Sequence, residues 1–292
     1  MTNSEASVSI VVPYYNPGET LRPHIENLLA ALKASGRSFE IIAVSDGSTD
    51  GSPRSLEGLP GDLVRRCETA SNVGKGWAIR RGFTQARGRY VGFIDADGDI
   101  GAEYVTRFVE VMEEQRLHAV IGSKCVRRGV GGSTGIRRLG SWGYRALVRS
   151  LFDLDVRDTQ VGVKLFDRSV VEALLPALTE NRFALDLELL VLARRAGFRR
   201  VVEMPVQIRT RAVTTVRLAS VWWITLDTAR VFVRSRRQVG IGLSGAGATR
   251  SVVEPTQLPA ATSVAVPVPL AVPVSVPAPV PAPVPTEGPV AA

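Results

Sequence analysis

The sequence predicts an α/β protein with a mostly parallel central sheet flanked by helices. Apolar runs of strand length alternate with segments of helical periodicity along most of the chain. Glycine, proline and acidic turn residues separate these segments. The apolar runs are continuous rather than alternating, which is typical of parallel strands that are buried on both faces.

The first β-α-β unit begins near the N-terminus. Residues 8–12 (VSIVV) form an uninterrupted apolar run, which ends at Pro13 and the Asn-Pro-Gly turn that follows. Residues 21–36 carry leucine and isoleucine at helical spacing, and Gly36 suits the residue that closes a helix. Residues 39–44 (FEIIAV) are the second apolar run and predict the second strand.

The middle of the chain repeats this alternation. Residues 74–86 predict a short helix, and residues 90–94 (YVGFI) predict another buried strand. Residues 101–115 place valine, phenylalanine and methionine on one helical face, and residues 118–122 return to a strand pattern. Residues 127–135 (RRGVGGSTG) are basic and rich in glycine, and they predict a mobile loop.

Further helices and one strand complete the first domain, which we expect over residues 1–212. Apolar positions at helical spacing predict helices over 139–151, 169–178 and 185–196. Residues 199–208 predict the last strand.

Two segments of different character follow this domain. Residues 213–238 contain a stretch, 216–237, that predicts one amphipathic helix with Trp222 and Trp223 on its apolar side. Paired tryptophans with flanking arginines suit a membrane interface, and packing on the first domain is the alternative. Residues 239–292 contain Val-Pro and Ala-Pro repeats, which predict an extended, disordered tail that acts as a spacer or as a docking site.

The composition limits partners and location. The net charge is +8 and the isoelectric point about 10.1, so the surface should attract anions such as nucleotides and phospholipid headgroups. No recognised nucleic-acid-binding motif accompanies this charge, and we expect no nucleic-acid partner. The N-terminus lacks a signal-peptide pattern, and no apolar stretch reaches the roughly 20 residues of a membrane span. We expect a cytoplasmic protein, or one held peripherally at the cytoplasmic face of the membrane.

The strongest chemical signal is a run of three aspartates, Asp95, Asp97 and Asp99, directly after the apolar run YVGFI. Ligands of open α/β sheets bind at the carboxyl ends of the strands. In an extended chain the three side chains point to one side and repel each other unless a cation neutralises them. Hard oxygen ligands suit Mg²⁺ or Mn²⁺, and a solvated acidic turn is the alternative. A calcium-binding EF-hand is excluded, because Ile100 stands where that loop needs glycine.

Two further turns contain candidate binding residues. One follows a predicted strand, and the other opens a predicted helix. Asp46, in the turn SDGSTD, could accept hydrogen bonds from a nucleobase or a ribose, and a plain turn is the alternative. The turn NVGKG places Gly74 and Lys75 before a helix that also carries Arg80. Glycines allow backbone N–H groups to approach a phosphate and the cations neutralise it, although a basic helix start is the alternative.

Four segments, VSIVVPYYN, VSDGSTD, NVGKGWAIRRG and FIDADGD, together resemble the family 2 glycosyltransferases of the GT-A fold in order and spacing. Residues 158–166 (DTQVGVKLF) and 183–190 (FALDLELL) resemble segments of dolichyl-phosphate β-glucosyltransferases and related polyprenyl-phosphate glycosyltransferases. The resemblance covers about residues 8–237 and implies a GT-A type nucleotide-binding domain.

The resemblance implies an inverting hexosyltransferase that moves a hexose from UDP-glucose or GDP-mannose to a polyprenyl or dolichyl phosphate, with Mg²⁺ or Mn²⁺ as cofactor. The nucleotide-sugar contacts that the motifs suggest are Pro13, Tyr15, Asp46, Gly74, Lys75, Arg80 and Asp95. The metal ligands are Asp95, Asp97 and Asp99, and the acceptor-phosphate contacts are Lys124, Arg127 and Lys164. The residues expected to act in catalysis are Asp97, Asp158 and Lys164. If the acceptor were a hydroxyl, Asp158 or Asp186 could serve as its base, and a structural role for either is the alternative.

Two departures from the family pattern concern the nucleotide. Pro17 stands where the family often has glutamate, and Ser45 stands where it often has a first aspartate. Three rival functions stay open. They are a family 2 transferase with a soluble or polysaccharide acceptor, a sugar-phosphate nucleotidyltransferase, and a non-catalytic nucleotide-sugar or protein-binding module. The nucleotidyltransferase would need a glycine-rich basic loop after the first strand, where Tyr14, Tyr15 and Asn16 stand instead.

Overall fold

The computed structural model describes residues 7–124, 156, 159–182 and 184–208. The chain divides into two units, Met1–Ala246 and Gly247–Ala292, and the described residues all belong to the first. The helices predicted over 139–151 and 216–237, the loop over 127–135 and the tail over 239–292 lie outside the described residues. They stay predictions, as do the domain boundaries after residues 212 and 238.

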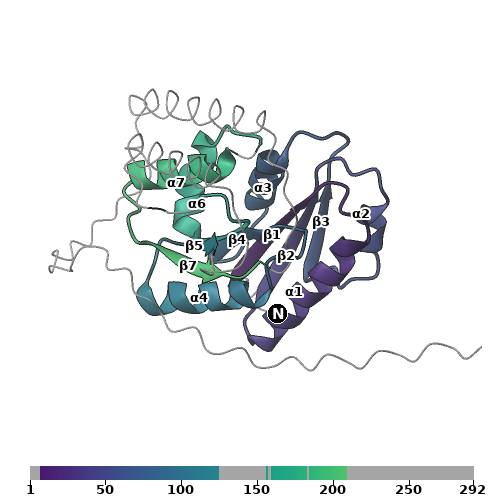
Figure 1. Cartoon of the computed structure of the whole chain (residues 1–292), viewed down its shortest axis with the longest axis horizontal. Helices are drawn as coiled ribbons and strands as arrows, with labels where there is room; N and C mark the ends of the chain where they lie inside the picture. The colour runs from purple at the N-terminus through teal and green to yellow at the C-terminus, as the bar shows by residue number, and fades with distance from the viewer. Residues whose placement is uncertain (1–6, 125–155, 157–158, 183, 209–292) are drawn as a thin grey trace, which may run out of the picture. The chain divides into compact units, whose positions relative to one another are not determined.

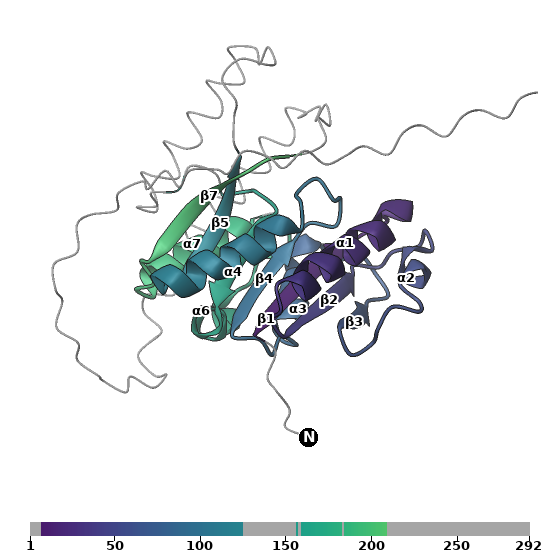
Figure 2. The same cartoon turned by 90° about the horizontal axis from the view of Figure 1, so that it is seen from below.

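A seven-stranded sheet forms the centre of the described residues, with the strand order β3-β2-β1-β4-β6-β5-β7 (Figures 1 and 2). The strands are β1 Val8–Tyr14, β2 Phe39–Ser45, β3 Val64–Glu68, β4 Tyr90–Ile94, β5 Ala119–Lys124, β6 Val163–Asp167 and β7 Val201–Val206. Within this sheet β6 alone runs antiparallel to its neighbours, and the other pairings are parallel. The prediction of a mostly parallel sheet is confirmed.

Helices cover both faces of the sheet (Figure 1). On one face lie α1 (Leu21–Ala34) and α4 (Glu103–Gln115), and on the other lie α3 (Lys75–Phe83), α6 (Arg168–Leu174) and α7 (Leu185–Arg195). A short helix, α2 (Ser52–Ser55), and two 3₁₀ turns, Gly18–Thr20 and Leu175–Ala177, complete the described elements. The layers match the flanked sheet that the alternating pattern predicts.

The continuous apolar runs are buried on both faces because each strand feeds two cores. In β1, Ile10 and Val12 pack in the core beneath α1 and α4, whereas Val11 packs in the core beneath α3. A side chain at Gly82 of α3 would overlap Val11, so this glycine lets α3 lie close against β1. This close packing brings the first turn of α3 to the carboxyl end of the strands.

The structure contains two strands that the apolar pattern did not predict. In β3 only Val64 is fully buried, and the strand lies at the edge of the sheet with two arginines and a glutamate. In β6 the buried residue Lys164 interrupts the apolar run. In both strands charged side chains interrupt the apolar pattern from which a strand is predicted.

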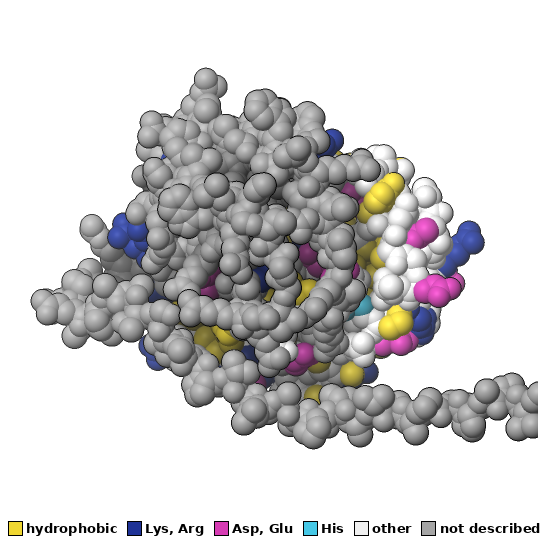
Figure 3. Space-filling view, in the orientation of Figure 1, with side chains coloured by type: hydrophobic (Ala, Val, Ile, Leu, Met, Phe, Trp, Pro, Cys, Tyr) yellow, Lys and Arg dark blue, Asp and Glu magenta, His cyan; other side chains and the backbone are white. Residues whose placement is uncertain are grey.

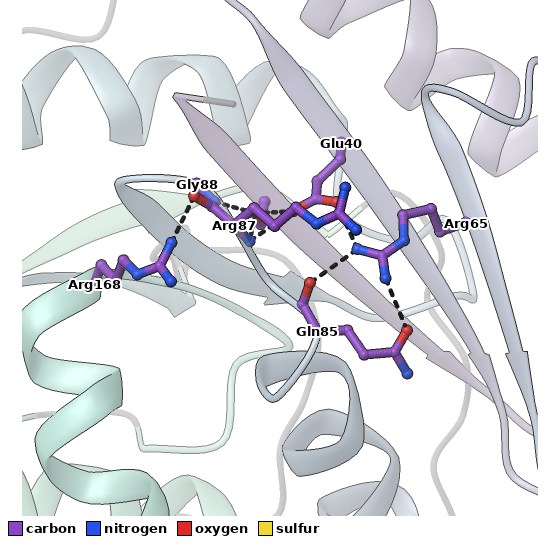
Figure 4. A network of polar contacts seen from close by, with 7 residues as sticks. Glu40, Arg65, Gln85, Arg87, Gly88 and Arg168 are labelled. Carbon is purple, nitrogen blue, oxygen red and sulfur yellow. Dashed lines mark hydrogen bonds and ion pairs between the residues drawn. The ribbon is translucent and has the colours of Figure 1, made fainter. Parts of the chain in front are cut away.

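A polar network around Glu40 holds the amino ends of several strands together (Figure 4). Its buried carboxylate accepts hydrogen bonds from the Ser9 hydroxyl at 2.7 Å, the Arg87 backbone N–H at 2.7 Å and Arg65 Nη1 at 2.9 Å. Arg168 Nη1 donates to the Arg87 carbonyl at 2.6 Å. The network ties β1, β2 and β3 to the turn that enters β4, at the edge opposite the predicted site.

The described surface carries both signs of charge. In the view of Figure 3, acidic and basic side chains are interspersed over the described part of that face. Cys67 is a half-buried free thiol, and Cys125 lies outside the described residues. No helix within the described residues combines the length and the apolar content that crossing a bilayer requires.

Candidate active site

The carboxyl ends of the parallel strands meet at one edge of the sheet, where a cavity of about 700 Å³ opens. Seven of the predicted site residues line it: Pro13, Tyr15, Asp46, Gly74, Lys75, Asp95 and Asp97. The remaining lining residues are Tyr14, Pro17, Thr20, Asn72, Val73, Ala78, Ala96 and Arg182. This volume lies within the range of about 300–1,000 Å³ that is usual for small-molecule sites.

Asp46 fastens two walls of the cavity together. Its side chain is buried, with Oδ1 accepting from the Val73 N–H and Oδ2 from the Gly74 N–H, each at 2.8 Å. The carboxylate therefore joins the end of β2 to the turn that opens α3. The predicted contact of Asp46 with a base or ribose would use the remaining lone pairs of oxygens that already hold this turn.

The glycines of this turn make room for a distant part of the chain. Gly74 has a φ of +128°, and a side chain there would overlap the Asn181 carbonyl. A Cβ at Gly76 would lie 2.7 Å from the Arg182 carbonyl oxygen. The sequence motif suggested that these glycines admit a phosphate, whereas the structure gives them a packing role against residues 180–182.

Arg80 also faces this distant segment. Its Nη1 donates to Asn181 Oδ1 at 3.0 Å, and the Trp77 N–H donates to the Asn181 carbonyl at 3.1 Å. Arg80 is not among the residues that line the cavity. Its predicted contact with the nucleotide stays a prediction, and the structure gives it a role in docking α3 onto residue 181.

The aspartates after β4 lie in different surroundings. Asp95 forms an ion pair with Lys75, with 2.5 Å between Oδ1 and Nζ, and its backbone N–H donates to the Gly162 carbonyl at 2.8 Å. Asp97 is exposed and lines the cavity, and its Oδ1 accepts from the Asp99 N–H at 3.0 Å. Asp99 is not a lining residue of the cavity.

The cavity floor is rich in carboxylates. Burial raises the pKa of the Asp95 carboxyl, the Lys75 ammonium opposes this, and the carboxylates of Asp186 and Asp97 raise it further. The pKa of Lys75 is raised, because the attraction of Asp95 and Asp186 outweighs the effect of burial. Burial is the main cause of the shift at Asp95, whereas the carboxylates of Asp186 and Asp97 contribute to both shifts, and their negative charge favours a bound cation.

The donor set fits a divalent ion that also binds a substrate. No group of three histidine, cysteine, aspartate or glutamate side chains in the described part of the chain could hold a metal ion alone. Two of the three predicted ligands, Asp95 and Asp97, share the cavity. Mg²⁺ usually binds through one or two carboxylates plus substrate phosphates, which this arrangement can supply. The third predicted ligand, Asp99, stays a prediction.

Gly162 sets the position of Asp95, which makes it a sharp test of the site. A methyl group at Gly162 would overlap the Asp95 carboxylate, and the two residues also share a backbone hydrogen bond. We expect Gly162→Ala to displace the carboxylate and lower kcat/KM for the reaction at this cavity ~100-fold, since a misplacement of about 1 Å can cost that much. Steady-state kinetics measure this, with Gly61→Ala as control because a Cβ there meets open space. An unchanged kcat/KM in Gly162→Ala would contradict the proposed importance of Asp95.

Lys164 is buried and does not line the cavity. The side chain is buried, with Nζ donating to the Val161 carbonyl at 2.8 Å and to the Asp186 carboxylate. The ammonium also lies 5.2 Å from the centre of the Phe93 ring. Its predicted contact with an acceptor phosphate and its part in catalysis stay predictions, while the structure shows Lys164 holding the loop before β6 against α7.

The other predicted acceptor contacts fall outside the cavity lining. Lys124 is exposed at the end of β5. In the parallel pairing of β5 with β7 it lies opposite Val206, the last residue of β7. Arg127 and Asp158 lie outside the described residues. Asp186 is buried against Lys164. This burial accords with the structural alternative for Asp186.

Sequence reasoning missed Arg182, which lines the cavity beside the turn that contains Gly74. It also missed Glu188, a buried carboxylate of α7 that binds residues 179 and 180. Neither follows a predicted strand, and although Glu188 lies in the family-like segment 183–190, neither residue received a site role from the sequence. The only available signal was the stretch FALDLELL, in which two acidic residues interrupt an apolar helix.

The mostly parallel sheet and the acidic strand ends around one cavity define an α/β domain with a ligand site at the carboxyl ends of its strands. The sequence pattern of glycosyl transferase family 2 matches residues 9–175. The chain belongs to this family.

Two relatives illustrate the likeness. The chain is 33% identical over 223 residues to the glycosyltransferase AglD of Haloferax volcanii. This alignment covers 74% of this chain and 35% of the relative. It is 30% identical over 203 residues to the dolichyl-phosphate beta-glucosyltransferase of Dictyostelium discoideum. This second alignment covers 64% of this chain and 62% of the relative. The chain therefore spans less than two thirds of each of these relatives.

A solved structure shares the fold. The glucosyl-3-phosphoglycerate synthase of Mycobacterium tuberculosis, in complex with Mn²⁺, UDP and phosphoglyceric acid, superposes with a TM-score of 0.60. Sequence identity is 18%, and the match covers 78% of each chain. The GT-A fold expected from the motifs is confirmed.

Proposed function

We propose that this chain is an inverting hexosyltransferase that moves a hexose from a nucleotide-sugar to a polyprenyl phosphate. One observation carries the proposal: Asp46, Lys75, Asp95 and Asp97 meet around a single cavity at the strand ends. The similarity to a dolichyl-phosphate beta-glucosyltransferase supports a lipid-phosphate acceptor. The family membership supports sugar transfer as the reaction.

UDP-glucose is the donor that we propose first, and GDP-mannose is the alternative. The glucosyltransferase name of the Dictyostelium relative and the UDP bound by the Mycobacterium enzyme motivate this order. The nucleoside would lie near Pro13 and Tyr15, and the diphosphate would extend towards Lys75. Tyr15 is 51% exposed, so an aromatic face is available to a base at the cavity mouth.

Asp97, with Asp95 beside it, would hold the Mg²⁺ or Mn²⁺ ion. When bound, such an ion neutralises the diphosphate and so improves it as a leaving group. The exposed carboxylate of Asp97 faces the cavity, whereas Asp95 also holds Lys75 in place. We therefore assign Asp97 as the principal metal ligand. Asp95 would be the second metal ligand, and it also positions the Lys75 ammonium beside itself.

The acceptor would attack without a general base. A phosphate monoester has a second pKa of about 6, so its oxygen is already anionic near neutral pH. This oxygen forms a bond to the anomeric carbon while the bond from that carbon to the donor diphosphate breaks, and the configuration inverts. The negative charge leaves with the nucleoside diphosphate. Lys124 and Arg127 would hold the acceptor phosphate, and a lipid acceptor would bring the protein to the cytoplasmic face of a membrane.

A transfer assay tests this proposal. Purified full-length chain is incubated with UDP-glucose or GDP-mannose, Mg²⁺ or Mn²⁺, and a polyprenyl phosphate. We expect labelled sugar to enter the organic phase as a lipid-phosphate sugar of inverted configuration. Label in a water-soluble product would favour the soluble or polysaccharide acceptor instead. Binding of the nucleotide-sugar without transfer or hydrolysis under all these conditions would favour the non-catalytic module and overturn the proposal.

A further inference from the structure

Glu188 is a buried carboxylate of α7 that serves neither the core nor the cavity directly. Its side chain accepts from the Thr179 N–H at 3.0 Å, the Thr179 hydroxyl at 2.8 Å and the Glu180 N–H at 2.9 Å. The residue is 3% exposed. A buried charge held by several donors loses much of its stabilisation when one donor is removed, so this contact fixes residues 179 and 180 firmly.

The segment fixed by Glu188 continues directly into the cavity wall. Asn181 accepts from the Trp77 N–H and from Arg80, both in α3. Gly76 allows this approach, since a Cβ there would lie 2.7 Å from the Arg182 carbonyl oxygen. Residues 180–182 are thus held from one side by α7 and from the other by α3, two neighbouring helices on the same face of the sheet (Figure 1).

Arg182 is the residue that this double attachment presents to the cavity. Its Cγ would lie 3.2 Å from a Cβ at Gly74, so the side chain runs along the turn that carries Lys75. Arg182 is exposed, and its guanidinium has no ion-pair partner among the described residues. Lys75, the other described cation in the cavity wall, is already paired with Asp95.

We propose that Arg182 binds the diphosphate of the nucleotide-sugar and that Glu188 is the positioning residue that sets its place. A guanidinium presents paired N–H donors that match phosphate oxygens, and the bond is charge-assisted. The inference rests on the proposed function in one respect, that the ligand of the cavity is a nucleoside diphosphate derivative. It adds a phosphate contact and the chain of contacts behind it.

Calorimetric titration of the full chain with UDP and with GDP, in the presence of Mg²⁺, tests the inference. We expect Arg182→Ala to raise Kd about tenfold or more, because a hydrogen bond to a charged group is lost, and Arg182→Lys to recover part of the loss. Arg81→Ala is the matched control, since Arg81 is an exposed arginine of α3 that does not line the cavity. Its Kd should stay within about twofold of the wild-type value.

Glu188→Gln tests the positioning step. If Glu188 acts through Arg182, Glu188→Gln should weaken nucleotide binding, and the double variant with Arg182→Ala should bind no more weakly than Arg182→Ala alone. Thermal melting checks that each variant is folded. Thr179→Val is a milder variant than Glu188→Gln, because it removes the hydroxyl donor to Glu188 and keeps the backbone N–H donor. It should weaken nucleotide binding in the same direction even if Glu188→Gln does not fold.

The outcomes separate this inference from the proposed function. An unchanged Kd in Arg182→Ala, an equal loss in Arg81→Ala, or no binding of UDP or GDP by the wild-type chain would each overturn the inference. A normal Kd with a raised KM for polyprenyl phosphate would also overturn it, because Arg182 would then serve the acceptor. If binding depends on Arg182 but no sugar is transferred, the proposed function fails and the inference stands.

Discussion

Asp97→Asn should lower kcat for sugar transfer by about a thousandfold or more, the largest effect on activity that we expect from a single substitution. The substitution keeps the shape and the Oδ1 acceptor that binds the Asp99 N–H, but it removes the charge. Loss of a carboxylate that holds a divalent ion forfeits several kcal/mol of stabilisation of the leaving group, and each 1.36 kcal/mol is about tenfold in rate. Steady-state transfer assays with UDP-glucose or GDP-mannose measure it.

Asp99→Asn is the matched control, because Asp99 belongs to the same acidic run but does not line the cavity. We expect it to keep kcat within about tenfold of wild type. An equal loss in Asp99→Asn would restore the three-ligand set that the sequence suggests. Near-normal activity in Asp97→Asn would remove Asp97 from the metal site.

Lys164→Met should lower the free energy of unfolding by about 3–5 kcal/mol, the largest effect on stability that we expect. Methionine keeps the apolar stem of lysine but leaves the Asp186 carboxylate buried without its ion pair. The Val161 carbonyl loses its hydrogen bond as well. Urea or guanidinium unfolding of the variant, with the wild-type chain in parallel, measures the difference.

The double variant Lys164→Met with Asp186→Leu separates the charge from the packing. Replacing both members of a buried pair by apolar residues is often neutral, so the double variant should regain most of the stability that the single variant loses. A double variant as unstable as Lys164→Met alone would mean that the pair matters for its shape and not for its charge. If the stable double variant also transfers no sugar, Lys164 or Asp186 has the additional catalytic role that the motifs suggest.

The strands that carry the site were predictable because their patterns are local. Residues 90–94 were expected as a strand and form β4 with those bounds, and the aspartates after it were expected at the ligand edge. Burial on both faces makes such strands read as plain apolar runs. The same regularity explains why seven predicted site residues lie around one cavity.

What escaped prediction depends on contacts between distant residues. Lys164 sits in a strand because Asp186, 22 residues later, neutralises it, and no local window contains both. Arg182 reaches the cavity because Gly74 and Gly76 leave space for its backbone. A sequence motif shows that a glycine is present but does not show which chain segment will occupy the space beside it.

The antiparallel strand β6 has a consequence for how the protein is made. It lies between β4 and β5 in the sheet but follows both in the chain, so β4 and β5 do not pair with each other. Until the residues from Val163 onwards have been synthesised, one edge of β4 and both edges of β5 therefore lack their strand partners. Completion of the sheet must wait for β6 and then for β7, the last of its strands in the chain, and until then the unpaired edges are open to self-association.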